Sequence, residues 1–367
     1  MKFIRQDVQS MHAYAIQDSA GFIKLDAMEN PFSLSAEMQK ALGERLGKVA
    51  INRYPGARVE DLKAALRSYV QVPASHGLML GNGSDELISL LAMATDTTPR
   101  VVSSDSGGKI LAPLPGFVMY AISAQLQGLQ FIGVDLTADF ELDEAAMLAA
   151  IHQEKPAITY LAYPNNPTAN LWDAAVIRKI IAACAAYGGM VVMDEAYQPF
   201  SPSSWMDEIK ANPSANANVL LMRTLSKFGL AGVRLGYMAG PQALINEIDK
   251  LRPPYNISSL NAECALFALE NSEAFRAQAG MITEQRAMLL EALAKLPGFK
   301  PFPSQANMIL VRVSQEIGGS DAMFAQLKAK GILVKNVSKM HPLLRNCLRL
   351  TVGTAEENQA MLQALRQ

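Results

Sequence analysis

Apolar runs that alternate with helical segments constrain the fold of this chain most strongly. Between residues 78 and 240, short apolar runs at residues 158–162, 190–193 and 219–222 are separated by segments with helical patterning. Uninterrupted apolar runs of this length are typical of strands that are buried on both faces of a sheet. The alternation therefore predicts an α/β fold, with a mainly parallel sheet flanked by helices.

The pattern changes after residue 241, where longer helical segments at 243–250, 260–270 and 274–296 precede strand-like runs at 307–313 and 348–352. This change predicts a second, smaller α+β domain, to which the N-terminal segment contributes. We expect residues 1–50 to form an N-terminal arm and part of the small domain. Residues 51–245 would then form the large domain, and residues 246–367 the small C-terminal domain.

Charge and composition limit the classes of partner. The chain of 367 residues has a formal net charge of −1, which argues against nucleic acid or a membrane surface as its main partner. No apolar run approaches a membrane span, and the N-terminus lacks the apolar core of a signal peptide, so we expect a cytoplasmic protein. The four histidines and three cysteines show no metal-ligand spacing, so we expect no metal site.

Three polar residues follow three of the predicted strands. Asn166, Asp194 and Lys227 lie just beyond the apolar runs at 158–162, 190–193 and 219–222. Ligands of parallel sheets bind beyond the carboxyl ends of the strands. We therefore expect these three side chains to share one site.

The glycine-rich stretch around Lys227 carries groups that suit covalent chemistry. A lysine beside a buried strand is costly unless it has a role or a partner, so Lys227 is a candidate nucleophile. The hydroxyls of Thr224 and Ser226, which would face the same way in an extended chain, and the guanidinium of Arg234 could hold an anion. On this stretch alone, a surface loop with solvated charges is an equal alternative.

A second glycine turn, at residues 81–83, leads from an apolar run into a helix for which Ser84 is the expected N-cap. Free backbone N–H groups at such a helix start often hold phosphate. An ordinary capped helix that binds nothing is the alternative.

Together these groups match one cofactor, pyridoxal phosphate. Lys227 could form a Schiff base with it, and Asp194 could pair with the pyridine nitrogen and so keep the ring an electron sink. Tyr197 and Asn166 could bind the phenolic oxygen, and Phe117 could stack on the ring. The groups that could hold the phosphate are Ser84, Asp85, Ser226 and Arg234.

The order of these motifs resembles that of the fold-type I aminotransferases, which depend on pyridoxal phosphate, and within them the histidinol-phosphate aminotransferase family. The resemblance spans nearly the whole chain and is carried by eight segments, namely residues 29–31, 52–55, 81–86, 117–120, 164–168, 194–197, 224–234 and 347–353. The run from Lys227 to Arg234 is one residue shorter than is usual in this family, which predicts a tighter path.

The resemblance implies roles for individual residues. Lys227 would be the imine-forming lysine, acting with Asp194 and Tyr197, while Thr224 would join the phosphate-binding group. The family is dimeric, and its Arg-Tyr-Pro tyrosine, here Tyr54, would reach the phosphate in the neighbouring subunit. The substrate-binding residues would be Arg349, Tyr14, Asn30 and Lys335.

The implied reaction is ping-pong transamination of histidinol phosphate with 2-oxoglutarate, in histidine biosynthesis, through an imine (aldimine) at Lys227. The expected partners are therefore a small amino donor, a 2-oxo acid and a second copy of the chain. An aminotransferase for aromatic or broad amino acids and a decarboxylase of a phosphorylated amino acid share the cofactor site and remain alternatives. A catalytically silent regulator is disfavoured by the presence of Lys227, Asp194 and Arg234.

Overall fold

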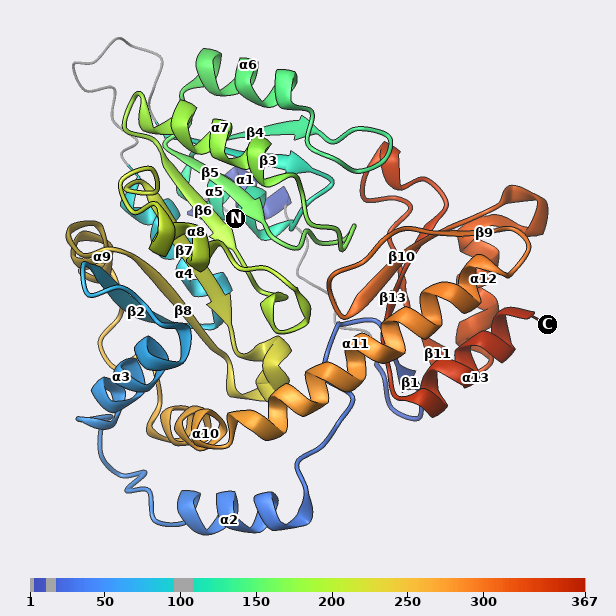
Figure 1. Ribbon diagram of the computed structural model, residues 1–367, viewed down its shortest axis with the longest axis horizontal. Helices are drawn as coiled ribbons and strands as arrows, with labels where there is room; N and C mark the ends of the chain where they lie inside the picture. The colour runs from blue at the N-terminus through green and yellow to red at the C-terminus, as the bar shows by residue number, and fades with distance from the viewer. Residues whose placement is uncertain (1–2, 11–17, 96–107, 367) are drawn as a thin grey trace.

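The computed structural model describes residues 3–10, 18–95 and 108–366. In this part of the chain, seven strands form one sheet, seen at the centre of the larger lobe in Figure 1. Its strands, in spatial order, are β2 (His76–Asn82), β8 (Leu235–Pro241), β7 (Val219–Thr224), β6 (Met190–Asp194), β5 (Ile158–Ala162), β3 (Lys109–Leu114) and β4 (Gln130–Asp135). β8 runs antiparallel to both β2 and β7, and the other described pairs are parallel, so the predicted mainly parallel sheet is confirmed.

The strands are buried on both faces because successive side chains point to opposite sides of the sheet. Val191 and Met193 of β6 lie in one apolar cluster, while Val192 between them lies in another. Most of the helical residues in the first cluster come from α3 (Arg58–Val70), α6 (Glu144–Glu154), α7 (Ala174–Ala185), α8 (Trp205–Ala211) and α10 (Ser259–Glu270). The helices that supply the second are α4 (Gly83–Ala94), α5 (Met119–Gln127) and α9 (Gln242–Asp249).

The C-terminal part of the chain forms a smaller lobe (Figure 1). Its antiparallel sheet contains, in spatial order, β12 (Lys335–Asn336), β13 (Cys347–Thr351), β10 (Met308–Val313) and β9 (Phe299–Pro301). A separate apolar cluster joins this sheet to α11 (Ser272–Ala294), α12 (Gly319–Ala329) and α13 (Ala355–Arg366).

The N-terminal segment reaches this smaller lobe. Strand β1 (Ile23–Lys24) pairs in parallel with β11 (Ile332–Leu333). Two further helices, α1 (Gln6–Ser10) and α2 (Ala36–Leu46), precede the large sheet in the chain. The domain boundaries at residues 50 and 245 stay predictions.

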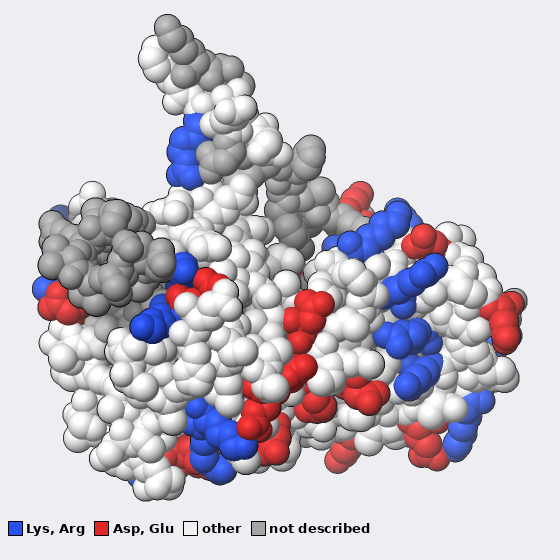
Figure 2. All heavy atoms as spheres, turned by 90° about the horizontal axis from the view of Figure 1, so that it is seen from above, with Lys and Arg blue, Asp and Glu red and all other residues white. Residues whose placement is uncertain are grey.

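The surface carries charges of both signs. On the face shown in Figure 2, basic and acidic groups are spread over a largely uncharged surface. Across the described ranges, no helix combines the length and apolar character that crossing a membrane requires.

A buried ion pair joins the ends of two central strands. Glu195 directly follows β6 and Arg223 lies at the end of β7, with 2.8 Å between the guanidinium Nη2 and the carboxylate Oε2. The Glu195 side chain has no exposed surface, and it also accepts hydrogen bonds from the backbone N–H of Trp205 and the hydroxyl of Ser204. The pair therefore fixes the residues immediately beside Asp194 and Thr224, at the carboxyl edge of the sheet.

Breaking this pair should destabilise the protein strongly, because Arg223→Met leaves a buried carboxylate unpaired. We expect a loss of about 3–5 kcal/mol in the free energy of unfolding, measured by equilibrium urea titration. Arg178→Met is the matched control, since Arg178 pairs with Glu208 on the surface, and it should cost no more than about 1 kcal/mol. Equal losses in the two variants would contradict this interpretation.

Candidate active site

A cavity of about 370 Å³ lies at the carboxyl edge of the large sheet. The strand ends meet there in register, since Ala162 of β5 pairs with Asp194 of β6, and Asp194 pairs with Met222 of β7. The cavity is lined by ten of the residues singled out in the sequence, namely Ser84, Asp85, Phe117, Asn166, Asp194, Tyr197, Thr224, Ser226, Lys227 and Arg234. The folded chain therefore brings together residues from strands, helix starts and loops that are far apart in the sequence.

Asp194 is held at the base of the cavity by two hydrogen bonds. Its Oδ1 accepts from the backbone N–H of Ala196 at 3.1 Å, and its Oδ2 accepts from the hydroxyl of Tyr120 at 2.7 Å. Burial raises the pKa of Asp194 to about 6, while these two donors oppose the rise. The carboxylate is therefore oriented and poised to bind a cationic group.

Lys227 lies on the turn that follows β7, the strand next to the one that carries Asp194. Its Nζ donates a hydrogen bond to the carbonyl of Ala27 at 3.0 Å and lies 5.8 Å from the ring centre of Tyr197. Burial, followed by the positive charge of Arg349, lowers the pKa of Lys227 to about 8. A substantial fraction of this amine is consequently neutral near pH 7–8, which is the form that acts as a nucleophile.

Arg234 reaches the cavity although its loop is short. The chain passes through a π-helical turn at Ser226–Leu230 and a 3₁₀ turn at Ala231–Val233, and Arg234 then adopts a left-handed conformation with φ of 54°. Its Nη2 lies 3.3 Å from Oδ2 of Asp85. This path delivers the guanidinium to the cavity, and the comparison with the longer loop of the family stays a prediction.

The start of α4 lies beside Arg234, and one prediction is corrected there. The N-cap of α4 is Asn82, not Ser84, because the helix begins at Gly83 and Ser84 lies in its first turn. Asn82 makes no side-chain capping bond, so the first backbone N–H groups of α4 remain available as donors. A Cβ on Gly236 would lie 2.7 Å from the backbone nitrogen of Ser84, so only glycine lets β8 approach this closely.

The two hydroxyls beside Lys227 meet, but not because the chain is extended. Ser226 opens the π-helical turn, and its backbone N–H donates to Oγ1 of Thr224 at 3.1 Å. The Thr224 and Ser226 hydroxyl oxygens are 3.0 Å apart. Together with Arg234 and the start of α4, they form a cluster of donors at one end of the cavity.

Asn166 is oriented by a residue from the smaller lobe. Arg349 of β13 donates through Nη1 to the amide oxygen of Asn166 at 2.8 Å and through Nη2 to the carbonyl of Asp26 at 2.8 Å. Because its oxygen is occupied, Asn166 presents its amide nitrogen as the donor for the cavity. Arg349 itself is buried and lies behind Asn166, outside the group of residues that line the cavity.

Asn30, Lys335 and Tyr54 do not line the cavity. Asn30 donates through Nδ2 to the side chain of Gln278 and accepts a hydrogen bond from the backbone N–H of Phe32. Lys335 is the cross-strand partner of Arg349. Tyr54 is 79% exposed and does not line the cavity of its own subunit. Tyr14 lies outside the described residues.

Two polar residues of the cavity, Tyr120 and Glu29, are not among the site residues predicted from the sequence. The Tyr120 hydroxyl donates a hydrogen bond to Asp194. Glu29 lines the cavity, whereas the sequence predicts a role for its neighbour Asn30. The position of Tyr120 three residues after Phe117, one helical turn on, is a signal that could have placed both rings at the same site.

The cavity fits pyridoxal phosphate. It offers a buried carboxylate for the pyridine nitrogen and a low-pKa amine for the aldehyde, together with an amide and a phenol for the ring oxygen. The hydroxyls, the guanidinium and the uncapped start of α4 form the donor set that a phosphate requires. Each polar group of the cofactor thus has a chemically suitable counterpart.

Comparison with known proteins places the chain in a family. Residues 20–365 match the model of the family described as aminotransferase class I and II, and the chain belongs to that family.

Individual relatives within it cover almost the entire chain. The chain is 65% identical over 364 residues to the histidinol-phosphate aminotransferase of Polaromonas naphthalenivorans, covering 99% of this chain and 95% of that protein. It is 61% identical over 365 residues to the histidinol-phosphate aminotransferase of Methylibium petroleiphilum, covering 100% and 94%. Among solved structures, that of histidinol-phosphate aminotransferase from Sinorhizobium meliloti in complex with pyridoxal-5′-phosphate has a similar fold. Its TM-score is 0.84 at 23% identity, covering 100% of this chain and 97% of that one.

Tyr120→Phe should weaken cofactor binding in a pH-dependent way. Loss of the hydroxyl removes a donor that stabilises the Asp194 carboxylate, so the pKa of Asp194 should rise further, by about one unit. Affinity for pyridoxal phosphate should fall as the pH is lowered and Asp194 is protonated. In Tyr120→Phe this fall, measured between pH 5 and 8, should occur at higher pH.

Tyr160→Phe is the matched control for this experiment. Tyr160 stacks on Tyr120 with ring centres 4.2 Å apart, but within the described residues its buried hydroxyl has no hydrogen-bond partner. Its removal should leave the pH at which cofactor affinity falls unchanged. If this pH did not change in Tyr120→Phe, or if it rose equally in both variants, the role of the Tyr120 hydroxyl would be contradicted.

Proposed function

We propose that this protein transfers the amino group of histidinol phosphate to 2-oxoglutarate, a step of histidine biosynthesis, with pyridoxal phosphate as its cofactor. The observation that carries the reaction class is the shared cavity of Lys227 and Asp194, one with a lowered pKa and the other with a raised one. The choice of donor is supported by the two relatives at 65% and 61% identity.

Different residues of the cavity would bind different parts of the cofactor. Asp194 would hold the pyridine nitrogen, Asn166 and Tyr197 the phenolic oxygen, and Phe117 the face of the ring. The phosphate would lie among Ser84, Asp85, Ser226, Arg234 and Thr224. When bound, the cofactor supplies an electron sink for the carbon that loses a proton.

Lys227 would carry the proton transfers. With a pKa of about 8, its neutral Nζ can accept a proton from the α-carbon of the amino donor and return it at the end of the half-reaction. The hydrogen bond to the carbonyl of Ala27 limits the positions that Nζ can take. The same amine can therefore act first as a base and then as an acid within one cavity.

The acidic end of both substrates would lie on the side of Arg349. Its guanidinium is buried, and Lys335 is its neighbour on β12. A guanidinium can bind a carboxylate or a phosphate through two parallel hydrogen bonds. Arg349 also contacts Asn166 and the carbonyl of Asp26, so it would connect the substrate side to the amide that faces the ring oxygen and to the segment at residues 26–29.

The active form would be a cytoplasmic homodimer. Tyr54 stacks on Tyr255 with ring centres 4.6 Å apart, and both rings are exposed in the single chain. Exposed aromatic pairs are typical of surfaces that a partner covers. Tyr54 would thus reach the cofactor phosphate of the partner subunit, while Tyr14 and Asn30 would contribute to the substrate side.

A panel of amino donors tests this proposal. With 2-oxoglutarate as acceptor, kcat/KM should be highest for histidinol phosphate, by at least about tenfold over histidine, phenylalanine and threonine phosphate. Lys227→Ala is the control and should lose turnover with every donor, together with the visible absorption of the bound cofactor.

The alternatives predict other outcomes of the same panel. A preference for phenylalanine would identify an aromatic or broad aminotransferase, so the reaction class would survive and the substrate would be wrong. Release of carbon dioxide from a phosphorylated amino acid without any 2-oxo acid would instead identify a decarboxylase. Turnover retained by Lys227→Ala would contradict the assignment of the nucleophile.

A further inference from the structure

The segment that carries Tyr54 has little packing of its own. Residues 47–57 connect α2 to α3, and in this fully described segment no residue is buried. Ile51 is 77% exposed and Tyr54 is 79% exposed. A segment with so little burial has a low free energy of local opening unless its ends are fixed. Within the single chain, the position of Tyr54 is therefore set by contacts at the two ends of the segment and by its stack on Tyr255.

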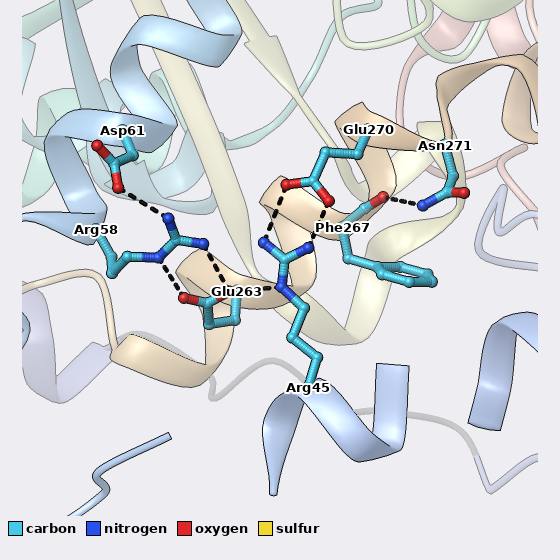
Figure 3. Close-up of polar contacts among 7 residues, drawn as sticks. All are labelled: Arg45, Arg58, Asp61, Glu263, Phe267, Glu270 and Asn271. Carbon is cyan, nitrogen blue, oxygen red and sulfur yellow. Dashed lines mark hydrogen bonds and ion pairs between the residues drawn. The ribbon is translucent and has the colours of Figure 1, made fainter. Parts of the chain in front are cut away.

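Both ends are held by a single carboxylate. Arg45, in the last turn of α2, donates through Nε to Oε2 of Glu263 at 2.7 Å. Arg58, the first residue of α3, donates to the same side chain through Nε at 2.5 Å and Nη2 at 3.0 Å. Figure 3 shows the two guanidinium groups approaching Glu263 of α10 from opposite sides. Glu263 thus joins the helix before the segment to the helix after it.

The environment makes this contact stronger than an ordinary surface ion pair. The Glu263 side chain is only 11% exposed, and hydrogen bonds from Arg58, assisted by Arg45, lower its pKa to about 2. The carboxylate is therefore ionised at every pH at which the protein works. Charge-assisted bonds of this kind, with low exposure, hold geometry better than exposed pairs do.

Each arginine also has a partner that serves only one end of the segment. Arg45 binds Glu270 through Nη1 at 2.5 Å and Nη2 at 3.1 Å, and Arg58 binds Asp61 at 2.8 Å. Of the carboxylates described in this cluster, only Glu263 contacts both arginines. Tyr255, against which Tyr54 stacks, lies a few residues before α10, so the same part of the chain also holds the ring.

We propose that Glu263 is a positioning residue for the active site, because it clamps both ends of the segment at residues 47–57 and so presents Tyr54 to the partner subunit. This inference rests on the proposed function of Tyr54 at the cofactor phosphate. Glu263 does not touch substrate or cofactor, and it acts only through the placement of Tyr54.

Trypsin cleavage after Arg53 of the holoenzyme tests the clamp directly, because cleavage requires the segment to open. Glu263→Gln keeps the size of the side chain but removes its charge, and it should raise the cleavage rate by roughly tenfold. Glu270→Gln and Asp61→Asn each weaken one end only and should raise it less. Glu208→Gln, which breaks the remote surface pair with Arg178, should leave it unchanged.

The link to the cofactor requires a second readout. The dissociation constant of pyridoxal phosphate should rise by roughly fivefold in Glu263→Gln and in Tyr54→Phe, with no further rise in the double variant, because both changes remove the same contact. If Glu263→Gln does not fold, Arg58→Gln repeats both measurements on a chain in which Glu263 keeps Arg45.

The outcomes separate the two proposals. Cleavage of Glu263→Gln at the rate of Glu208→Gln would overturn the clamp. A second result would also overturn it. If Glu263→Gln lowered the cofactor affinity by the same factor in the wild-type protein and in Tyr54→Phe, Glu263 would act by a route that does not involve Tyr54. Faster cleavage combined with an unaltered affinity in Tyr54→Phe would support the clamp and would refute the role proposed for Tyr54.

Discussion

Desolvation of two ionisable groups that form no salt bridge is the constraint on which this structure depends. Asp194 and Lys227 lie at one edge of the sheet, and within the described residues neither forms a salt bridge. Desolvation moves the pKa of each toward its neutral form, up to about 6 for Asp194 and down to about 8 for Lys227. Such an arrangement costs stability in the free protein. It favours a ligand that brings a cationic ring nitrogen to one group and a carbonyl to the other.

The rest of the fold holds this edge in place. The Glu195–Arg223 pair ties the residues next to Asp194 and Thr224, and Tyr120 fixes the carboxylate from α5. Arg349 crosses from the smaller sheet to Asn166 and to the backbone of Asp26, so the three parts of the chain meet at the cavity. Movement of the smaller lobe would therefore change the position of the Asn166 amide, which is expected to face the ring oxygen.

Much of this arrangement follows from local sequence patterns. The mainly parallel sheet and the meeting of Asn166, Asp194 and Lys227 could be predicted because apolar runs and strand ends are local features. The N-cap of α4 could not, since the chain turns into the helix at Gly83, before the serine that the pattern favoured. The hydrogen bond from Tyr120 to Asp194 and the double contact of Glu263 join residues 74 and more than 200 positions apart. No pattern within a short window reports such contacts.

The most direct test of the central claim is the titration of Lys227 in the protein freed of cofactor. The rate at which an amine-directed reagent labels Lys227, followed from pH 6 to 11 by peptide mass analysis, reports the neutral fraction of its Nζ. The account predicts a midpoint near the pKa of about 8 that burial and Arg349 impose. Since the pKa is depressed, the labelling rate should be nearly constant above pH 9. A midpoint near 10.5, the ordinary value for lysine, would contradict the claim that desolvation of this edge activates the amine.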